Sequence, residues 1–280
     1  MLQSESSSKD VRPFWTSDSG DFALLRGDVR KVLRSLDGRK FDMVFADPPY
    51  FLSNGGISIQ SGRPVSVNKG RWDESRGRYA DRQFTREWLS DCRSVMSDSA
   101  TIWICGTFHN IFTVAESLVE LDFRILNMVT WQKSNPPPNL SCRFFTHSTE
   151  FIVWARKSKR VAHRFNYDLM RKVAGGRQMT DVWRLPAIAP WEKTCGKHPT
   201  QKPVALVARA IMACTSRGQC VLDPFTGSGT TGIAANLLGR NFVGGDLDVE
   251  YLTVAQNRRI EMELSRVAWL SKLKDIKAIN

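Results

Sequence analysis

Residues 221–231 read VLDPFTGSGTT, and this stretch decides the fold of the 280-residue chain. An apolar pair leads into an acid, a proline and two closely spaced glycines, and the run from Gly232 to Leu238 then ends at Gly239. This order predicts a buried strand, a tight turn and a helix closed by a C-terminal glycine. Glycines let the backbone pass close to a ligand, and a helix N-terminus favours negative groups. The stretch therefore predicts a ligand site in an α/β fold, with a plain strand–helix connection as the alternative.

The next apolar run, residues 241–245, ends in Asp246. An acid at the tip of the second strand is the usual partner of ribose hydroxyls in nucleotide-binding α/β folds. Only Gly227 and Gly229 are tightly spaced and no lysine follows them, so the turn matches neither G-x-G-x-x-G nor a phosphate-binding loop. With Asp223 just before it, the turn suits a ligand that has an amino acid end and a nucleoside end. S-adenosylmethionine has both.

A second motif, Asp47-Pro48-Pro49-Tyr50, follows the apolar run 41–46. The prolines fix φ and carry no N–H, so carbonyl oxygens there stay free to accept hydrogen bonds. Asp47 adds a carboxylate, and Tyr50 offers a flat ring for stacking. These residues predict a stiff cup for a planar ring with an exocyclic amine, a description that adenine fits. A strand that ends in a Pro-Pro turn, with Tyr50 capping the core, is the alternative.

Together the two motifs resemble those of the amino-methylating DNA methyltransferases, with the target-amine motif D-P-P-Y and the cofactor motif F-x-G-x-G. The target-amine motif comes first, which is the order of the family's β class. Residues 46–56, 131–133, 138–143 and 145–150 look like the DpnA-type N6-adenine methyltransferases, a subgroup associated with GATC sites. The resemblance runs from about residue 22 to residue 262.

The resemblance implies a Rossmann-like S-adenosylmethionine-dependent methyltransferase fold, with a mostly parallel seven-stranded sheet and one antiparallel strand. The alternation of strand-like and helix-like segments also indicates an α/β sheet with ligands at the carboxyl ends of its strands. We expect a flexible segment over residues 1–18 and a methyltransferase domain over residues 19–280. Within the domain, residues 51–82 are predicted to be a mobile loop and residues about 134–200 a DNA-recognition region.

Hydrophobic periodicity predicts further elements along the chain. Helices are expected over about residues 85–96, 110–121, 202–215 and 248–272, and strands over 101–105, 125–131 and 151–155. Arg258 and Arg259 are interpreted as part of the solvent-exposed face of the last helix.

Single roles also come from the resemblance. Residues 198–203, HPTQKP, look like the segment that closes over the methionine end of the cofactor, which implies that Lys202 lies near the methionine carboxylate. Residues 25–28 look like the motif near the cofactor adenine, which implies the same for Asp28. A surface lysine at a helix start is the alternative for Lys202. The expected cofactor contacts are Asp28, Lys202, Asp223, Phe225, Gly227, Ser228, Gly229, Thr230, Thr231 and Asp246.

These assignments predict a site-specific DNA methyltransferase that moves a methyl group from S-adenosylmethionine to the N6 amine of a flipped-out adenine. The expected catalytic residues are Asp47, Pro48, Pro49 and Tyr50, which would hold the amine in line and stabilise the positive charge that develops on it. The chemistry requires no metal. An RNA adenine-N6 methyltransferase and a non-catalytic nucleic-acid-binding subunit are the alternatives. The presence of Asp47, Gly227 and Gly229 argues against the non-catalytic subunit.

Charge favours a polyanionic partner, because 40 Lys and Arg residues outnumber 28 Asp and Glu residues for a net charge of +12. Residues 156–200 mix basic and aromatic residues, which suits contact with double-stranded DNA, although a solvated basic surface is the alternative. The expected DNA contacts are Asn135, Asn139, Ser141, Arg143, His147, Lys69 and Arg71. For those between residues 135 and 147, a structural loop is an equal alternative.

The six cysteines contain no C-x-x-C pair, so neither a zinc site nor a disulfide framework is indicated. No stretch reaches the roughly 20 apolar residues that span a bilayer, and residues 1–9 lack the apolar core of a signal peptide. We therefore expect a cytoplasmic protein that works on the bacterial nucleoid, with no membrane partner. From the resemblance we expect a homodimer and allow for a cognate restriction endonuclease.

Overall fold

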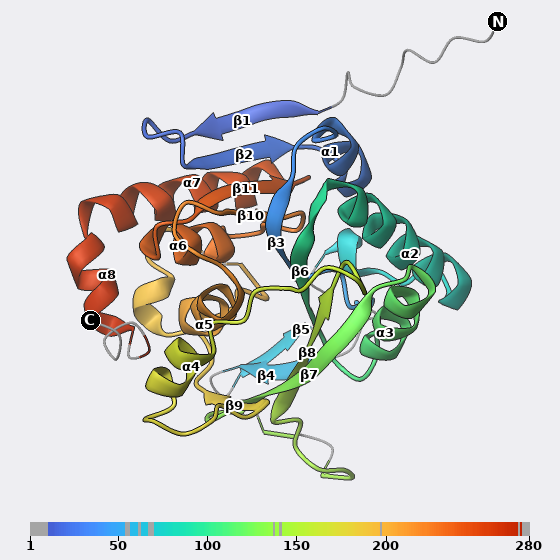
Figure 1. Cartoon of the computed structure of the whole chain (residues 1–280). Helices are drawn as coiled ribbons and strands as arrows, with labels where there is room; N and C mark the ends of the chain where they lie inside the picture. The colour runs from blue at the N-terminus through green and yellow to red at the C-terminus, as the bar shows by residue number, and fades with distance from the viewer. Residues whose placement is uncertain are drawn as a thin grey trace, which may run out of the picture.

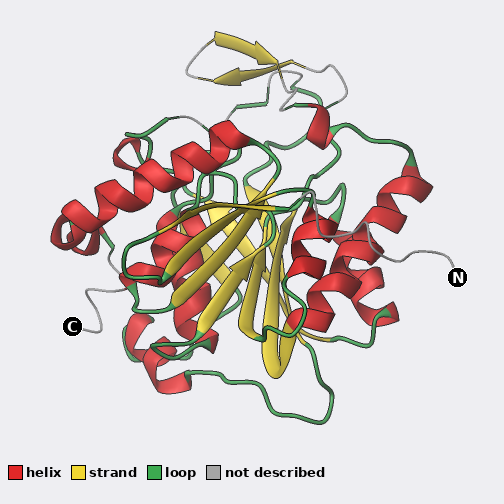
Figure 2. Cartoon of the chain, turned by 90° about the horizontal axis from the view of Figure 1, so that it is seen from above, coloured by secondary structure: helices red, strands yellow, loops and turns green. Residues whose placement is uncertain are grey.

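The computed structural model describes residues 11–53, 57–60, 63–66, 70–136, 138–139, 142–196, 198–273 and 275. A nine-stranded sheet lies between two layers of helices (Figures 1 and 2). Its strands are β1 (Arg12–Thr16), β2 (Phe22–Arg26), β3 (Phe41–Ala46), β6 (Met96–Gly106), β7 (Arg124–Lys133), β8 (Thr149–Arg156), β9 (Val182–Leu185), β10 (Cys220–Asp223) and β11 (Asn241–Asp246). A separate hairpin comprises β4 (Ile57–Gln60) and β5 (Arg63–Ser66).

The helices share the two faces of the sheet between them. They are α1 (Val29–Ser35), α2 (Arg78–Val95), α3 (Ile111–Glu120), α4 (Tyr167–Val173), α5 (Val204–Cys214), α6 (Thr230–Leu237), α7 (Val249–Leu264) and α8 (Arg266–Lys272), with 3-10 turns η1 (Arg71–Asp73) and η2 (Pro190–Glu192).

Seven strands form the centre of the sheet in the order β2-β11-β10-β3-β6-β8-β7. Only β8 runs antiparallel within this described group, against both β6 and β7. The predicted Rossmann-like, mostly parallel seven-stranded sheet with one antiparallel strand is therefore confirmed. Two further strands extend it, because β1 pairs antiparallel with β2 at one edge and β9 pairs parallel with β7 at the other.

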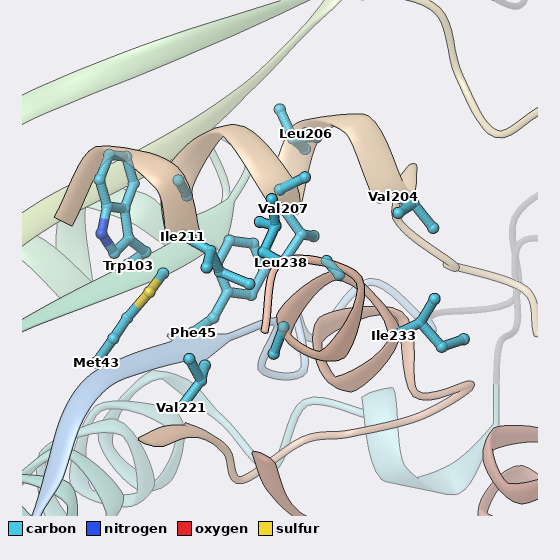
Figure 3. Packing of buried hydrophobic residues seen from close by; sticks show 14 of the residues in the cluster. Met43, Phe45, Trp103, Val204, Leu206, Val207, Ile211, Val221, Ile233 and Leu238 are labelled. Carbon is cyan, nitrogen blue, oxygen red and sulfur yellow. The ribbon is translucent and has the colours of Figure 1, made fainter. Parts of the chain in front are cut away.

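The central strand β3 is buried on both faces, which explains its unbroken apolar sequence. Met43 and Phe45 belong to a cluster that α5, α6 and α7 cover, whereas Val44 and Ala46 belong to the cluster beneath α1, α2 and α3. Figure 3 shows Met43 and Phe45 on the side of α5, together with Trp103 of β6. Burial of each large apolar side chain stabilises the folded protein by about 1.5–3 kcal/mol. This packing fixes the position of the carboxyl end of β3.

The chain leaves the neighbouring strands β3 and β10 in opposite directions. Their register pairs Val221 with Met43 and Leu222 with Val44. From β3 the chain passes through α2 to β6, whereas from β10 it passes through α6 to β11 on the other side. This reversal opens a crevice at the carboxyl ends of the two strands, where ligands of doubly wound sheets bind. Both sequence motifs begin there.

Part of the N-terminal segment that was expected to be flexible forms a regular strand. Residues 12–16, within the segment 1–18 expected to be flexible, form the edge strand β1. Phe14 and Trp15 pack against the hydrophobic core, and this anchoring holds the strand despite the polar sequence around it. Residues 1–10 of the predicted flexible segment lie outside the described residues.

The predicted mobile loop over residues 51–82 contains regular structure. It includes the β4–β5 hairpin, η1 and the first residues of α2, which begins at Arg78. Figure 2 shows the hairpin standing apart from the main sheet. Residues 54–56, 61–62 and 67–69 lie outside the described part of the chain, and the mobility of the segment stays a prediction.

The C-terminal helix, predicted as one piece over residues 248–272, consists of α7 and α8, which meet at Ser265. Ser265 has φ −123° and so leaves the helical region. Arg258 and Arg259 are 0% and 3% exposed, so their interpretation as part of a solvent-exposed face is wrong. They point inward because they find polar partners there: Arg259, for example, donates to Asn236 Oδ1 at 2.5 Å.

Candidate active site

A cavity of about 760 Å³ lies at the carboxyl ends of β2, β3, β10 and β11. Asp47 of the amine motif and Asp223 of the glycine turn both line it. The fold thus brings the two motifs of the sequence to one cavity. All the expected cofactor contacts line it except Gly229, namely Asp28, Lys202, Asp223, Phe225, Gly227, Ser228, Thr230, Thr231 and Asp246.

Asp223 ends β10 and is only 3% exposed. Its Oδ1 accepts a hydrogen bond from the backbone N–H of Phe225 at 3.0 Å, and its Oδ2 accepts one from the Thr231 hydroxyl at 2.5 Å. Burial raises the pKa of Asp223 to about 7, although the two hydrogen bonds act to lower it. The carboxyl group therefore changes its charge near neutral pH at the wall of the cavity.

The two glycines of the turn serve different purposes. Gly227 and Gly229 have φ of +49° and +76°, a region that residues with a Cβ rarely adopt. A Cβ on Gly227 would lie 2.9 Å from His198 Nε2, beside the cavity. A Cβ on Gly229 would lie 2.7 Å from the Cβ of Ala255 in α7. Gly229 therefore acts through close packing behind the turn rather than by lining the cavity.

A buried arginine that sequence reasoning missed supports the same turn. Arg258 of α7 donates through Nη1 to the Ser228 carbonyl at 2.6 Å and to the Thr230 hydroxyl at 3.0 Å. Burial lowers the pKa of Arg258 to about 10, which still leaves a cation at neutral pH. The guanidinium thus fixes the backbone at the start of α6 from the side away from a ligand.

Two further carboxylates reach the cavity, Asp246 from the last position of β11 and Asp28 from the residues after β2. Asp246 accepts hydrogen bonds from the backbone N–H groups of Gly227 and Asp248, at 2.8 and 2.9 Å. Burial raises the pKa of Asp246 above its usual range. Asp28 caps α1 by accepting from the backbone N–H of Arg30 at 3.1 Å. Each carboxylate retains lone pairs for a ligand hydroxyl.

Asp47 follows β3 and is held by two side chains. Its Oδ1 accepts a hydrogen bond from the Tyr50 hydroxyl at 2.8 Å, and its Oδ2 accepts one from Lys202 Nζ at 2.6 Å. Burial, reinforced by the charge of Asp47, raises the pKa of Tyr50, so the phenol stays protonated and donates. Pro49 lines the large cavity, while Pro48 and Tyr50 line a small one beside it.

The ring of Tyr50 is less accessible than the sequence led us to expect. Tyr50 is 7% exposed, and Lys202 Nζ lies 5.3 Å from the centroid of its ring. The predicted open face for stacking is therefore largely covered, because the aromatic ring packs into the core beneath the motif. Stacking of a target base on this ring stays a prediction.

Lys202 connects the amine motif to Glu150, which lies on strand β8. Lys202 is 7% exposed, which excludes the surface lysine considered above. Its Nζ lies 3.7 Å from Glu150 Oε2, and Glu150 Oε1 lies 2.5 Å from Lys133 Nζ. Burial acts to lower the pKa of Lys202, but Asp47 and Glu150 outweigh it and raise the pKa. Lys202 lines the cavity as predicted for a cofactor contact, while its ammonium group is bound to Asp47.

Trp72 and Asp73, from η1, complete the walls of the small cavity beside Tyr50. The ring of Trp72 stacks on His198 with centroids 6.5 Å apart, and Asp73 is 1% exposed. Sequence reasoning missed both residues, because they lie in the segment predicted to be a mobile loop. The sequence feature that could have indicated their role is a tryptophan next to an acidic residue within a polar, glycine-rich stretch.

The structure divides the expected DNA contacts into two groups. Asn135 Oδ1 accepts a hydrogen bond from the backbone N–H of Ala187 at 3.1 Å, and Asn139 donates to the Phe144 carbonyl at 2.5 Å. Asn139 therefore stabilises its own loop, whereas Asn135 connects the segment after β7 to the segment after β9. Arg143 and His147 are exposed instead. Lys69 and Ser141 lie outside the described residues, and for Arg71 only the backbone, in η1, is described.

His147 belongs to an exposed aromatic group at the same end of the sheet as Asp47. Its ring stacks on Phe108 with centroids 5.3 Å apart and lies 5.4 Å from Phe144. Phe108 and Phe144 are 47% and 58% exposed. Phe108 follows β6, the parallel neighbour of β3, which places this group at the end of the sheet where Asp47 lies.

Within the described part of the chain, no cluster of three or more His, Cys, Asp or Glu side chains has the arrangement of a metal site. None of the described helices is both long and apolar enough to cross a membrane. The six cysteines are free thiols.

Comparison with known proteins gives consistent matches over most of the chain. The model of a DNA methylase family matches residues 41–257. The type II methyltransferase M2.MboI of Moraxella bovis is 48% identical over 252 residues, which cover 90% of this chain and 92% of that protein. The type II methyltransferase M2.DpnII of Streptococcus pneumoniae is 48% identical over 254 residues, 90% of this chain and 94% of that one.

Solved structures show the same fold. The M1.HpyAVI-SAM complex is similar with a TM-score of 0.65 and 27% identity, over 85% of this chain and 98% of that one. The cytosine-N4-specific PvuII DNA methyltransferase has a TM-score of 0.68 at 16% identity, over 87% of this chain and 86% of that one, which is a likeness of fold alone.

Proposed function

Because this chain belongs to the DNA methylase family, we propose that it transfers a methyl group from S-adenosylmethionine to the N6 amine of an adenine within a short DNA sequence. Site-specific DNA methylation with S-adenosylmethionine follows from the family. The choice of amine is our inference. Transfer to an amine is supported by the position of Asp47, whose carboxylate lines the same cavity as the glycine turn, and the choice of adenine rests on the resemblance of residues 46–56 to the N6-adenine subgroup.

The cavity fits S-adenosylmethionine in size and in chemistry. Its volume of about 760 Å³ lies within the range of about 300–1,000 Å³ usual for small-molecule sites. Asp246 and Asp28 would accept hydrogen bonds from the nucleoside end, and Asp223 would face the cationic amino acid end. Gly227 leaves space beside His198 that a side chain would fill. When bound, the cofactor supplies a methyl group activated by its sulfonium.

Asp47 would accept a hydrogen bond from the target amine. Each of its oxygens already accepts one hydrogen bond, from Tyr50 or from Lys202, and a carboxylate oxygen can accept a second. The two protein donors fix the orientation of the carboxylate before the substrate arrives. Positive charge that develops on the amine nitrogen is then stabilised by a preoriented negative group.

A target base must leave the duplex to reach Asp47, at a cost of a few kcal/mol. The small cavity between Tyr50 and Trp72 has a volume of only about 10 Å³, so a base can enter only when one of these side chains moves. Stacking against these rings would return about 1–3 kcal/mol.

Duplex DNA would contact the exposed group of Phe108, Phe144, His147 and Arg143. Aromatic rings and an arginine suit bases and phosphates respectively, and the net charge of +12 attracts the polyanion. We further propose a homodimer in the cytoplasm, acting on the nucleoid beside a cognate restriction endonuclease.

An RNA substrate is the second candidate, because the same cup would hold an adenine amine in RNA. A non-catalytic role is disfavoured by the joint presence of Asp47 and the glycine turn at one cavity.

The decisive experiment is expression in methylation-free bacterial cells followed by single-molecule sequencing of the genome. We expect N6-methyladenine in one short motif, with GATC as the motif that the subgroup resemblance favours. An unmodified genome from cells that contain folded, cofactor-binding protein would contradict the proposal and turn attention to RNA. Size-exclusion chromatography with light scattering tests the homodimer.

A further inference from the structure

We propose that Asp73 is a positioning residue of the methyl-transfer site. Its carboxylate holds the backbone of the catalytic loop, which we define as residues 47–53, in the conformation that presents Asp47 to the target amine. This inference rests on the proposed role of Asp47 as the acceptor of that amine.

The carboxylate of Asp73 collects donors from four successive loop positions. Its Oδ1 accepts from the backbone N–H groups of Tyr50 at 2.8 Å and Phe51 at 2.9 Å. Its Oδ2 accepts from the N–H of Leu52 at 3.2 Å and from the Ser53 hydroxyl at 3.0 Å. The backbone carbonyl of Asp73 also accepts from the N–H of Ser53 at 3.2 Å. Although Asp73 lines the small cavity, both of its oxygens are engaged by donors of the catalytic loop, which is the arrangement of a positioning residue.

The loop needs such support because its sequence excludes the usual kinds. Pro48 and Pro49 donate no backbone hydrogen bond, so the loop cannot continue the hydrogen-bond ladder of the central strand β3. Phe51 has φ +59°, a conformation that costs a residue with a Cβ about 1–2 kcal/mol. Three consecutive N–H groups converge on one acceptor, as in backbone anion sites. The buried carboxylate of Asp73 therefore accepts the hydrogen bonds of the loop's backbone N–H groups and stabilises its strained conformation.

Tyr50 transmits this support to the reacting group. Its backbone N–H is bound by Asp73, while its hydroxyl donates to Asp47 Oδ1 at 2.8 Å. The side chain is 7% exposed and so has little freedom to adjust. A shift of the Tyr50 backbone would therefore move the hydrogen bond that orients Asp47.

The turn that carries Asp73 is itself anchored to the cofactor side. The N–H of Asp73 donates to the Gly70 carbonyl at 3.1 Å, and Trp72 between them stacks on His198. His198 in turn lies against Gly227 of the glycine turn. Asp73 thus sits where the catalytic loop meets the walls of the cofactor cavity.

The substitution Asp73→Asn tests the role with almost no change in shape. The amide keeps one acceptor oxygen and turns an NH₂ group toward donors that need an acceptor. We expect the single-turnover rate constant of methyl transfer to fall about 100-fold, the loss typical of a small misplacement of reacting groups. The affinity for S-adenosylmethionine, measured by calorimetry, and the affinity for DNA are expected to stay at the wild-type values.

The rate constant and the amplitude separate positioning from general damage. Partial unfolding would lower the amplitude of the single turnover, which counts folded enzyme, and leave the rate constant unchanged. A D73N rate constant equal to that of the wild type would overturn the proposal. Asp81→Asn is the matched control: Asp81 follows in the same segment and accepts from the Ser75 hydroxyl and the Arg76 N–H, outside the catalytic loop. An equal loss of rate in D81N would also overturn it.

Ser53→Ala provides a milder test should D73N fail to fold. It removes one hydrogen bond to Asp73 Oδ2, and we expect a fall in the rate constant of up to about tenfold with unchanged cofactor affinity. A wild-type rate constant would contradict the proposal. The wild-type protein is assayed first on duplex DNA and on RNA: methylation of a different base or polymer would refute the proposed function, and D73N compared on that substrate would still test Asp73.

Discussion

The glycine turn, residues 223–231, and the catalytic loop, residues 47–53, border the same cavity but are stabilised in different ways. The turn lies between a buried strand and the helix that follows it, and α7 packs behind it through Ala255 and Arg258. The next described element after the catalytic loop is the strand β4. Asp73 and Lys202 hold the loop from distant parts of the chain.

This contrast separates two kinds of dependence. The turn depends on shape at its glycines, where a Cβ would collide with neighbours, in addition to the hydrogen bonds that it makes with Arg258 and Asp246. The loop depends on charge, because buried ionic groups fix its backbone and its carboxylate. Steric substitutions should therefore damage cofactor binding, whereas charge substitutions should damage methyl transfer or the stability of the loop.

The largest effect is expected from Asp47→Ala. Loss of the acceptor removes both orientation of the amine and stabilisation of its positive charge, so the rate constant should fall by at least 10²–10³-fold, roughly the effect of deleting one preoriented electrostatic group. S-adenosylmethionine affinity should survive, since the glycine turn is intact. Single-turnover methylation and calorimetry measure the two quantities. Retention of most of the activity would remove Asp47 from the mechanism.

Lys202→Met should lower stability. It leaves the carboxylates of Asp47 and Glu150 at a buried site without their shared cation, and removal of one partner of a buried pair costs about 3 kcal/mol or more. Chemical denaturation measures the free energy of unfolding. Lys159→Met is the control, because Lys159 pairs with Asp122 at the surface, with side chains 57% and 65% exposed, and should change stability by less than about 1 kcal/mol. Equal losses in the two variants would contradict the contrast.

Gly227→Val should weaken S-adenosylmethionine binding by about 10- to 100-fold, which corresponds to about 1–3 kcal/mol of backbone strain and collision. The added Cβ would lie 2.9 Å from His198 Nε2, and the valine would have to adopt φ +49°. Gly175→Val imposes similar strain at φ +70°, with nothing within 4 Å of the added Cβ and no contact with the cavity. Calorimetry should find wild-type affinity in G175V. Unchanged affinity in G227V would count against the turn as the cofactor site.

The glycine turn could be predicted from the sequence because its determinants are local. Strand, turn and helix follow one another between residues 220 and 239, and each is visible as an apolar run, a glycine pair or a capping glycine. Six of the seven central strands could be expected on the same basis, whereas β2 was implied only by the seven-stranded sheet of the family resemblance. The same kind of local pattern indicated that Asp47 follows a buried strand.

The support of the catalytic loop could not be predicted in this way. Asp73 and Lys202 reach it only because the sheet order brings separate segments together, and nothing near Lys202 in the sequence points to Asp47. Arg258 was misassigned for the same reason: its partner, the Ser228 carbonyl, lies on a preceding element. Local periodicity places an arginine on a helix but does not reveal what the helix packs against.

The smallest expected effect is a pH dependence of S-adenosylmethionine affinity, which arises from Asp223 at the start of the glycine turn. Burial raises the pKa of Asp223 to about 7, so its carboxyl group is neutral in mildly acidic solution and ionised above that pH. If it faces the cationic end of S-adenosylmethionine, affinity should rise between pH 6 and pH 8, by at most about tenfold per pH unit below the pKa. Calorimetry across this range measures it.

The stability of the cofactor-free protein should move in the opposite direction. The folded state holds a proton on Asp223 that the unfolded chain releases near pH 4. The contribution of this group to stability is therefore complete below about pH 4 and is lost as pH rises through about 7. Asp223→Asn keeps the size of the side chain and cannot ionise, so both pH dependences should flatten. An identical rise of affinity with pH in D223N would assign the titration to another group, such as Asp246, which binds the Gly227 N–H and whose pKa burial also raises.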